Sequence, residues 1–371
     1  MNKLLKRTAV GLSCLMALSL ASCSQGGTPA ASPANQNNET PAAVQTPTAP
    51  LPAPFSEGQV HIAIVQNSGQ GDYFQQYLNG TKLQAAALNM KLDVYDAAGD
   101  NAKQASLLDQ AIATKPAGII VRHGMADTLC PGVNNALKQG IKVVIYDVEI
   151  QKCAPDAVQT QQSDAKMASL VLDQMLADVG KDAKVGYVNV SGVAPLDRRD
   201  AVWQQYKKDN NWTEEFKTGK YTDSTATDTT PMVYAALQAH PDVVAIYAPY
   251  DELTKGTLSA LEQAKMTDKV KVYGADISAA DIELMKADGS AWKATGATDP
   301  NAIGAAVTRT LILDIAGQLQ TKSVDFPPIL VTPDMLTQKN ITTMADLRAA
   351  EPTLNISDIS SADWIPAVTF Q

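Results

Sequence analysis

Asp147 is the acidic residue whose setting in the sequence most clearly suggests chemistry. It follows Lys142–Tyr146, an apolar and aromatic run after Gly140 that is typical of a strand buried on both faces. Residues 126–139 before it predict a helix, and helix plus buried strand form half of a parallel α/β unit. Ligands of open parallel sheets bind beyond the carboxyl ends of the strands, where a carboxylate can accept two hydroxyl hydrogen bonds from a polyol. The alternative is that Asp147 only caps a loop.

No motif in the sequence indicates catalysis. The metalloprotease, nucleophile-elbow, Walker and dinucleotide-binding patterns are all absent. The three histidines, His61, His123 and His240, have no nucleophile at a telling offset, and His123 is interpreted as a surface loop residue. Trp203 and Trp292 are interpreted as packing residues. No calcium loop or zinc pattern occurs, so we expect a non-enzyme without metal or cofactor.

The composition limits the size class and the partners. A chain of 371 residues is too long for one ordinary domain and fits two. Its 45% hydrophobic and 5% aromatic residues are normal for an α/β protein. The net charge of −9 argues against binding to phosphate backbones. We therefore expect no nucleic-acid partner.

Residues 1–22 are expected to be a targeting segment. Three basic residues precede an apolar run at Ala9–Ala21, which is too short to span a membrane. The small residues before Cys23 resemble a bacterial lipoprotein cleavage site. We therefore expect a signal peptide over 1–22 and a lipid on Cys23 that anchors an exported protein in a membrane. An ordinary signal peptide with an incidental cysteine is the alternative.

Residues 23–58 are rich in Pro, Ala, Thr, Asn and Gln, and we expect them to be a disordered tether because they cannot form a core. Two cysteines, Cys130 and Cys153, then remain on either side of the strand that ends at Tyr146. In an exported protein we expect them to be bonded, with the loop 148–161 pinned to the preceding helix at a gain of roughly 3 kcal/mol. Two free thiols are the alternative.

Strands and helices are expected to alternate through the rest of the chain, forming two doubly wound parallel-sheet lobes. The first lobe is assigned 59–162 plus 298–331, and the second 163–297 plus 332–371. The expected strands are Val60–Val65, Lys91–Tyr95, Ala117–Val121 and Lys142–Tyr146, then Lys184–Val190, Phe216–Tyr221, Val243–Tyr247, Val270–Tyr273 and Trp292–Gly296, with a last one at Pro327–Val331. A crevice between two such lobes would enclose a small ligand.

Several short motifs follow one another in an order that can be compared with known families. They are Ile62–Val65 with Asp72-Tyr73-Phe74, Ile145-Tyr146-Asp147, His240–Tyr247 with Tyr250-Asp251, and Val272–Asp276. Their order and spacing resemble the periplasmic sugar-binding proteins of ABC transporters, the ribose-binding type (type I), over about Val60–Val331. Leu129-Cys130-Pro131 together with Cys153 is most similar to the rhamnose- and autoinducer-2-binding branch.

The resemblance implies a set of ligand contacts. These are Asn67, Tyr73, Phe74, Arg122, Asp147, Arg198 or Arg199, Tyr250, Asp251, Asp276 and Thr298. Carboxylates and guanidinium groups would bond to vicinal hydroxyls, and aromatic rings would cover the C–H faces of a sugar. Arg122, Tyr250 and Thr298 differ from the ribose pattern, and the arginines would also tolerate an acidic sugar.

The implied function is that of a monomeric, extracytoplasmic solute-binding lipoprotein that captures a sugar or polyol and delivers it to an ABC permease. The lobes would close on the ligand about hinges near 161–164, near 296–299 and just after Val331. The alternative output is a ligand-loaded sensor that docks on a membrane receptor or kinase. The sequence does not separate these two outputs.

Overall fold

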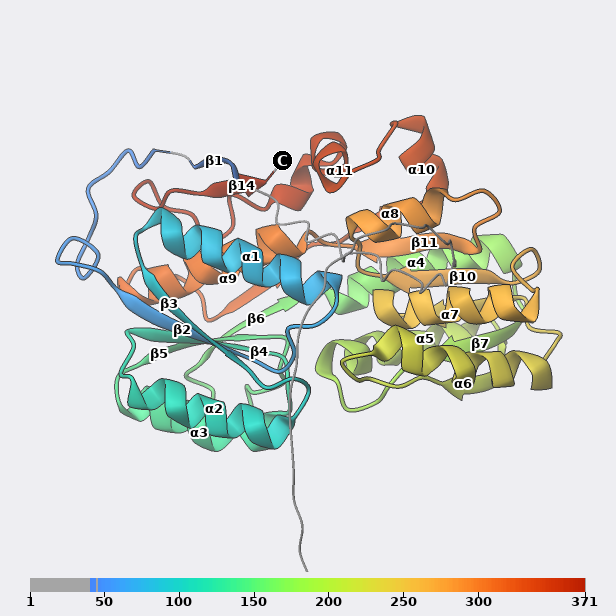
Figure 1. The fold of residues 1–371 in the computed structure, drawn as a ribbon, viewed down its shortest axis with the longest axis horizontal. Helices are drawn as coiled ribbons and strands as arrows, with labels where there is room; N and C mark the ends of the chain where they lie inside the picture. The colour runs from blue at the N-terminus through green and yellow to red at the C-terminus, as the bar shows by residue number, and fades with distance from the viewer. Residues whose placement is uncertain (1–40, 45, 371) are drawn as a thin grey trace, which may run out of the picture. The chain divides into compact units, whose positions relative to one another are not determined.

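The computed structural model describes residues 41–44 and 46–370, and every statement below refers to these residues. The expected signal peptide, the lipidation site at Cys23 and the first part of the expected tether, 23–40, lie outside the described residues. The described chain contains two six-stranded sheets with helices on their faces (Figure 1). The predicted fold class, two doubly wound α/β lobes, is therefore confirmed.

The sheet of the first lobe is parallel throughout, in the order β12-β6-β5-β4-β2-β3. Its central strands are nearly continuous runs of buried apolar residues, because helices cover both faces. The strands are β2 (His61–Gln66), β3 (Lys91–Asp96), β4 (Gly118–Arg122), β5 (Lys142–Tyr146), β6 (Val158–Gln162) and β12 (Ser323–Phe326).

Helices α1 (Asp72–Ala87) and α9 (Pro300–Ile315) pack against each other in the first lobe, while α2 (Asn101–Ala113) and α3 (Ala126–Lys138) form a second pair (Figure 1). Two glycines let α1 and α9 come close together. A Cβ on Gly80 would lie 1.9 Å from the carbonyl oxygen of Asn301, and one on Gly304 would lie 2.0 Å from that of Tyr77. Larger residues would push the two helices apart.

The sheet of the second lobe has the order β13-β11-β10-β9-β7-β8 and is parallel except for β13, which runs antiparallel to β11. The strands are β7 (Lys184–Val188), β8 (Thr213–Thr218), β9 (Ala245–Ala248), β10 (Lys271–Ala275), β11 (Trp292–Ala297) and β13 (Ile329–Val331). The helices are α4 (Asp164–Val179), α5 (Ala194–Asp209), α6 (Thr225–Ala239), α7 (Asp251–Ala264) and α8 (Ala279–Lys286). Buried Trp203 stacks on two tyrosines and Trp292 joins an apolar cluster, so both are packing residues as predicted.

Two strands of the first sheet were missed by the sequence analysis. Residues 158–162 form β6, where we expected the end of a loop, and 323–326 form β12. Both segments are polar, so they lack the apolar run of a buried strand. Their ladder bonds need no particular side chain, and the Thr160 hydroxyl donates to the carbonyl oxygen of Ile145 at 2.8 Å.

The third connection between the lobes lies elsewhere than predicted. We assigned 298–331 to the first lobe, but β13 pairs with β11 of the second sheet. The chain therefore crosses between Phe326 and Ile329, and not after Val331. The other two connections run from β6 to α4 and from β11 to α9, close to the expected positions.

The C-terminal segment divides between the lobes, so our assignment of 332–371 to the second lobe holds for α10 and α11 but not for the last strand. Helices α10 (Pro333–Gln338) and α11 (Met344–Ala350) pack with the second lobe. Strand β14 (Val368–Phe370), which follows a short 3₁₀ turn at Pro352–Asn355, then contacts α1 and α9.

The last part of the expected tether is also structured, which corrects that prediction. Strand β1 (Pro41–Val44) pairs antiparallel with β14, and the buried ring of Phe55 lies 5.3 Å from that of Trp364. The amide of Thr48 donates to the carbonyl oxygen of Asp363 at 2.8 Å. The composition of this segment does not reveal these contacts, because its partner is the distant C-terminal segment.

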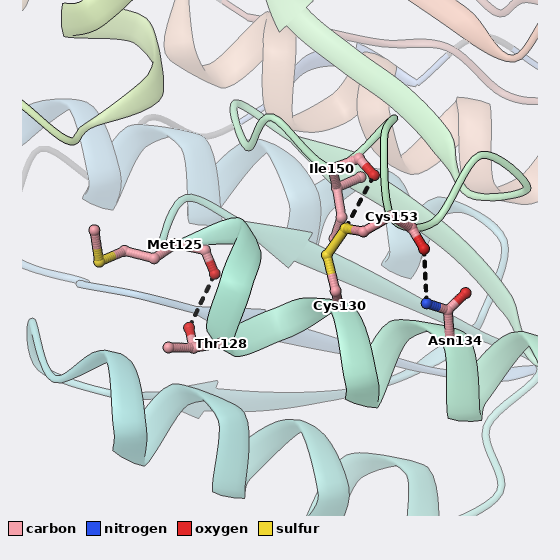
Figure 2. Close-up of a disulfide and its surroundings, with 6 residues drawn as sticks. All are labelled: Met125, Thr128, Cys130, Asn134, Ile150 and Cys153. Carbon is pink, nitrogen blue, oxygen red and sulfur yellow. Dashed lines mark hydrogen bonds between the residues drawn. A yellow bond between two sulfur atoms is a disulfide. The ribbon is translucent and has the colours of Figure 1, made fainter.

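The predicted disulfide between Cys130 and Cys153 is present, with 6.0 Å between the two Cα atoms (Figure 2). It joins α3 to the loop after β5, and the side-chain amide of Asn134 donates to the carbonyl oxygen of Cys153 at 2.9 Å. The bond therefore holds the loop that carries Val148–Ile150 against α3, beside the carboxyl end of β5.

Candidate ligand-binding cleft

A cleft lies between the carboxyl ends of the two sheets, the place where folds of this kind usually bind small molecules. Both lobes contribute side chains. The lining residues are Tyr73, Phe74, His123 and Gln162 from the first lobe, and Val193, Pro195, Leu196, Arg199, Tyr221, Tyr250 and Asp276 from the second.

The aromatic side of the cleft comes from the start of α1. Gly71, with a φ of 90°, turns the chain into the helix, so that Tyr73 and Phe74 fall in its first turn. The Tyr73 hydroxyl is hydrogen-bonded to that of Tyr146, and burial raises the Tyr73 pKa well above its usual value. The Phe74 ring meets the imidazole of His123 edge-on at 5.1 Å. Phe74 therefore offers the cleft only an apolar surface.

Two carboxylates occupy equivalent positions at the ends of β5 and β10. Asp147 and Asp276 both have left-handed backbones, with φ of 55° and 72°, and both are buried. Their backbone amides donate to the neighbouring strands, to the carbonyl oxygens of Thr160 and Gly296. Among the described residues, Asp147 Oδ2 and Asp276 Oδ1 have no hydrogen-bond partner. Each lobe therefore holds one buried acceptor oxygen at a strand end. Asp276 lines the cleft, whereas Asp147 Oδ2 lies 3.8 Å from Nε2 of the lining residue His123.

Burial dominates the electrostatics of both acids. It raises the pKa of Asp147 to about 7, with a further contribution from nearby Asp164, and it raises the pKa of Asp276 as well. Burial and the neighbouring arginines lower the pKa of His123 well below its usual value, so its ring is neutral near pH 7. The ring also leaves Nδ1 without a described partner.

The two consecutive arginines at the start of α5 have different places. Arg199 is buried, lines the cleft, donates from Nε to Asp164 at 2.7 Å and from Nη1 to the carbonyl oxygen of Pro249 at 2.6 Å. Its Nη1 also lies 3.6 Å from Asp276. Arg198 reaches the first lobe instead, with 2.6 Å bonds to Asp147 and Glu149.

Besides Asp147 and Arg198, which bond to each other and are not part of the lining, four more predicted contact residues do not line the cleft. Asn67 donates to Asn101 and Gln104, at 2.9 and 3.0 Å, and the Asp251 carboxylate lies 3.2 Å from Lys255. Thr298 stands behind the cleft wall, donating to Gln162 at 2.6 Å.

Arg122 is the fourth of these residues. Its buried guanidinium donates to the carbonyl oxygens of Phe74 and Ser68, at 3.0 and 2.5 Å, and lies over the rings of Phe74 and Tyr77. Burial lowers its pKa. Arg122 thus fixes the loop and helix that carry Phe74.

Sequence reasoning missed several lining residues. His123 lines the cleft, so its interpretation as a surface loop residue was wrong. Gln162 was hidden because β6 itself was missed. Val193, Leu196 and Tyr221 have the spacing of ordinary core residues, and nothing in the sequence marks them. Asn189 directly follows β7, a position that could have singled it out, and both its side-chain polar atoms are buried without a described partner.

Three groups of polar contacts join the lobes around the cleft. Besides Arg198, the Ser68 hydroxyl donates to Asp223 at 2.8 Å. Asp72, at the start of α1, accepts from Lys255 at 3.0 Å and from the Ser278 hydroxyl at 3.1 Å. Lys255 also neutralises acids of its own lobe, such as Glu252 at 2.8 Å. The described conformation is therefore one in which the lobes are in contact.

Comparison with known proteins places this arrangement in a family. Residues 62–319 match the model described as the periplasmic binding protein domain, and the chain belongs to this family. Its members are extracytoplasmic substrate-binding proteins of transport systems. Among the residues that the structure describes, no helix has the length and apolar character needed to cross a bilayer.

Two solved structures and one curated relative show the range of similarity. The 5-methylthioribose transporter solute-binding protein of Thermotoga lettingae, in complex with 5-methylthioribose, is 35% identical, with a TM-score of 0.80 over 82% of this chain and 97% of that one. A sugar ABC transporter protein of Yersinia enterocolitica is 30% identical, with a TM-score of 0.82 over 85% and 97%. The ribose import binding protein of Salmonella typhimurium is 26% identical over 66% of this chain and 81% of its own length.

Proposed function

We propose that the protein captures an uncharged sugar or sugar-like polyol between its two lobes and delivers it to an ABC permease. The observation that carries this proposal is the pair of buried carboxylates, Asp147 and Asp276, one at a strand end of each lobe. Each has an oxygen without a described partner, and hydroxyl groups are the donors that such oxygens require. A ligand that bonds to both would hold the lobes together.

The charges around the cleft favour a neutral ligand. Arg199 is already shared between Asp164 and a backbone carbonyl, and Arg198 is shared between Asp147 and Glu149. The charges of both arginines are thus already balanced by acids of the protein, since Arg199 also lies 3.6 Å from Asp276. An anionic ligand would instead face the unpaired oxygens of buried acids, at a large desolvation and repulsion cost.

Closure on the ligand follows from the position of the contacts. Asp72, Ser68 and Arg198 make their cross-lobe bonds only when the lobes approach each other. A ligand that binds both lobes adds free energy to this closed arrangement alone, and so shifts the population toward it. The closed form would then be the one that a permease recognises.

The relatives support the ligand class. The proteins compared above bind 5-methylthioribose, a sugar and ribose by their descriptions, and the first two are at least 30% identical to this chain. We also propose that a lipid on Cys23 anchors a monomeric protein, with residues 23–40 between the lipid and β1. Mass spectrometry of the mature protein would test this anchor, since an unmodified N-terminus beyond residue 23 would contradict it.

A thermal-shift screen of pentoses, hexoses, deoxysugars, polyols and sugar acids tests the proposed function. A neutral sugar at 100 times its dissociation constant should stabilise the protein by about 2.7 kcal/mol, and sugar acids should give no shift. Stabilisation by sugar acids alone, or by no sugar in the panel, would refute the proposal.

A further inference from the structure

We infer that the cleft takes a sugar bearing an apolar substituent, and that Phe74, Val193, Leu196, Tyr221 and Tyr250 read this substituent. The inference rests on the proposed sugar-binding function and adds a class of ligand and its specificity residues. It starts from the chemistry of the lining, where side chains without any polar atom lie together with the aromatic rings of Tyr221 and Tyr250.

The five side chains form one continuous apolar surface across both lobes. The ring of Tyr250 lies 6.4 Å from that of Phe74 and 6.3 Å from that of Tyr221. Leu196 belongs to the same buried cluster as Phe74 and Tyr250, and Val193 and Tyr221 pack against it. A ligand group against this surface is therefore enclosed by carbon from the first and the second lobe together.

The start of α5 lacks some of the polar groups that are usual at the start of a helix. Helix N-termini present free backbone N–H groups, commonly with a Ser, Thr, Asn or Asp cap. Here Val193 is the cap residue, with no side-chain cap bond, and Pro195 in the first turn has no N–H to donate. The only side chains that α5 adds before Arg199 to the lining are those of Val193, Pro195 and Leu196. The side chains of this wall can pack against a methyl or thioether group and cannot pair with a hydroxyl.

The polar donors and acceptors of the lining lie on other residues. Asp276, Arg199, Gln162, His123 and the hydroxyl groups of Tyr221 and Tyr250 carry them, and the Tyr73 hydroxyl is already bonded to Tyr146. A sugar hydroxyl placed against the side chains of Val193, Pro195 and Leu196 would find no side-chain partner there, which lowers affinity. Replacing that hydroxyl by an apolar group removes the loss and buries carbon.

Isothermal titration with ribose, 5-deoxyribose, 5-methylthioribose and the methyl ribosides tests the inference, because the substituents probe both ends of the sugar. We expect the best substituted sugar to bind at least about 10-fold more tightly than ribose, since one apolar group in an apolar pocket changes selectivity by about 10- to 200-fold. Equal or tighter binding of ribose would overturn the inference and leave the proposed function standing. If none of these compounds binds while another sugar of the thermal-shift screen does, the inference fails and the proposed function stands.

Two variants assign the preference to the wall of α5. Leu196→Asn should reduce the preference for the substituted sugar over ribose about 10-fold. Val193→Thr keeps the shape of the side chain and should reduce it about threefold, so the test survives if the first variant does not fold. The matched control is Val202→Thr, which lies on the same helix outside the lining and should leave the ratio unchanged. An unchanged ratio in Val193→Thr and in folded Leu196→Asn would overturn the assignment.

Discussion

The polar and apolar parts of the cleft lining are held in different ways. The polar groups Asp276 and Arg199 sit at a strand end and a helix start, where ladder bonds and buried ion pairs fix them. Asp147, which lies 3.8 Å from the lining residue His123, is fixed in the same way. The apolar groups, such as Phe74 and Leu196, are extensions of the hydrophobic core that reach the cleft. The polar part therefore fixes the hydroxyl pattern of a ligand, while the apolar part determines which substituent fits beside it.

The largest effect on affinity is expected from Asp276→Asn. This substitution keeps the size of the side chain but removes a buried charge that should accept ligand hydroxyls beside Arg199. We expect sugar affinity to fall by about 2 to 4 kcal/mol, since truncated charge-assisted bonds in buried sites cost this much. Titration calorimetry with the best sugar from the screen measures it.

The control for this prediction is Asp178→Asn. Asp178 belongs to the same lobe, accepts from the Tyr273 hydroxyl at 2.6 Å and lies outside the lining. The sugar affinity of Asp178→Asn should stay within about threefold of that of the unsubstituted protein. This is a change of less than about 1.4 kcal/mol in binding free energy, which would correspond to tenfold. Equal losses in the two variants would show that Asp276 acts through stability and not through the ligand.

Affinity should also depend on pH through Asp147. Burial raises the pKa of this carboxyl to about 7 in the unliganded protein, whereas ligand hydroxyls donate to the ionised form and so lower it in the complex. Below the unliganded pKa a proton must leave before the ligand binds. Affinity should therefore rise with pH from about 5.5 to 7.5, by at most about tenfold per unit, and level off above.

Calorimetry across this pH range checks the dependence, together with the number of protons released at pH 6.5. Asp147→Asn removes the titrating group and should flatten the profile, besides lowering the affinity. A profile of the same slope in Asp147→Asn would assign the titration to another group.

A smaller effect on sugar affinity is expected from a substitution at a contact between the lobes that lies outside the cleft lining. Asp72→Asn removes the cross-lobe ion pair with Lys255 but leaves Lys255 its own-lobe partners. Partly exposed ion pairs contribute about 0 to 1 kcal/mol, so the dissociation constant should rise up to about fivefold, with less effect at high salt. Asp127→Asn, in the first turn of α3, is the matched control and should change nothing. A larger response in Asp127→Asn would contradict the role of Asp72 in closure.

The smallest effect on affinity is expected at Arg122, although the sequence predicts it as a ligand residue. Arg122→Gln leaves the carbonyl oxygens of Phe74 and Ser68 unpaired, which should cost about 2 kcal/mol or more in the free energy of unfolding. The affinity of the folded protein should change less than it does in Asp72→Asn. Denaturant unfolding and calorimetry measure the two effects separately, and a stable variant that no longer binds would restore Arg122 as a ligand residue.

The polar part of the site was more predictable than the apolar part for a physical reason. Asp147 and Asp276 interrupt apolar runs, so their position at a strand end is visible in the sequence. Val193 and Leu196 look like any core residue, because contact with a cleft leaves no mark in hydrophobic periodicity. Arg122 shows that a polar residue at a strand end need not contact a ligand, because its guanidinium donates to carbonyl oxygens of its own lobe.

The prediction of the fold was right where strands are buried apolar runs, and it failed where a strand lacks such a run. Buried parallel strands such as β4 and β5 are apolar runs between helices, whereas β6 and β12 are polar segments identified only by their ladder partners. The same holds for β1 and β14, which lie more than 300 residues apart in the sequence and pair with each other.

A crystal structure of the protein grown with 5-methylthioribose, and in parallel with ribose, tests the central claim most directly. The account predicts one sugar bridging the lobes, with hydroxyl oxygens within hydrogen-bond distance of Asp147 Oδ2 and Asp276 Oδ1, and with the methylthio group against Leu196. A sugar bound to one lobe only, or bound with both carboxylates turned away from it, would contradict the account.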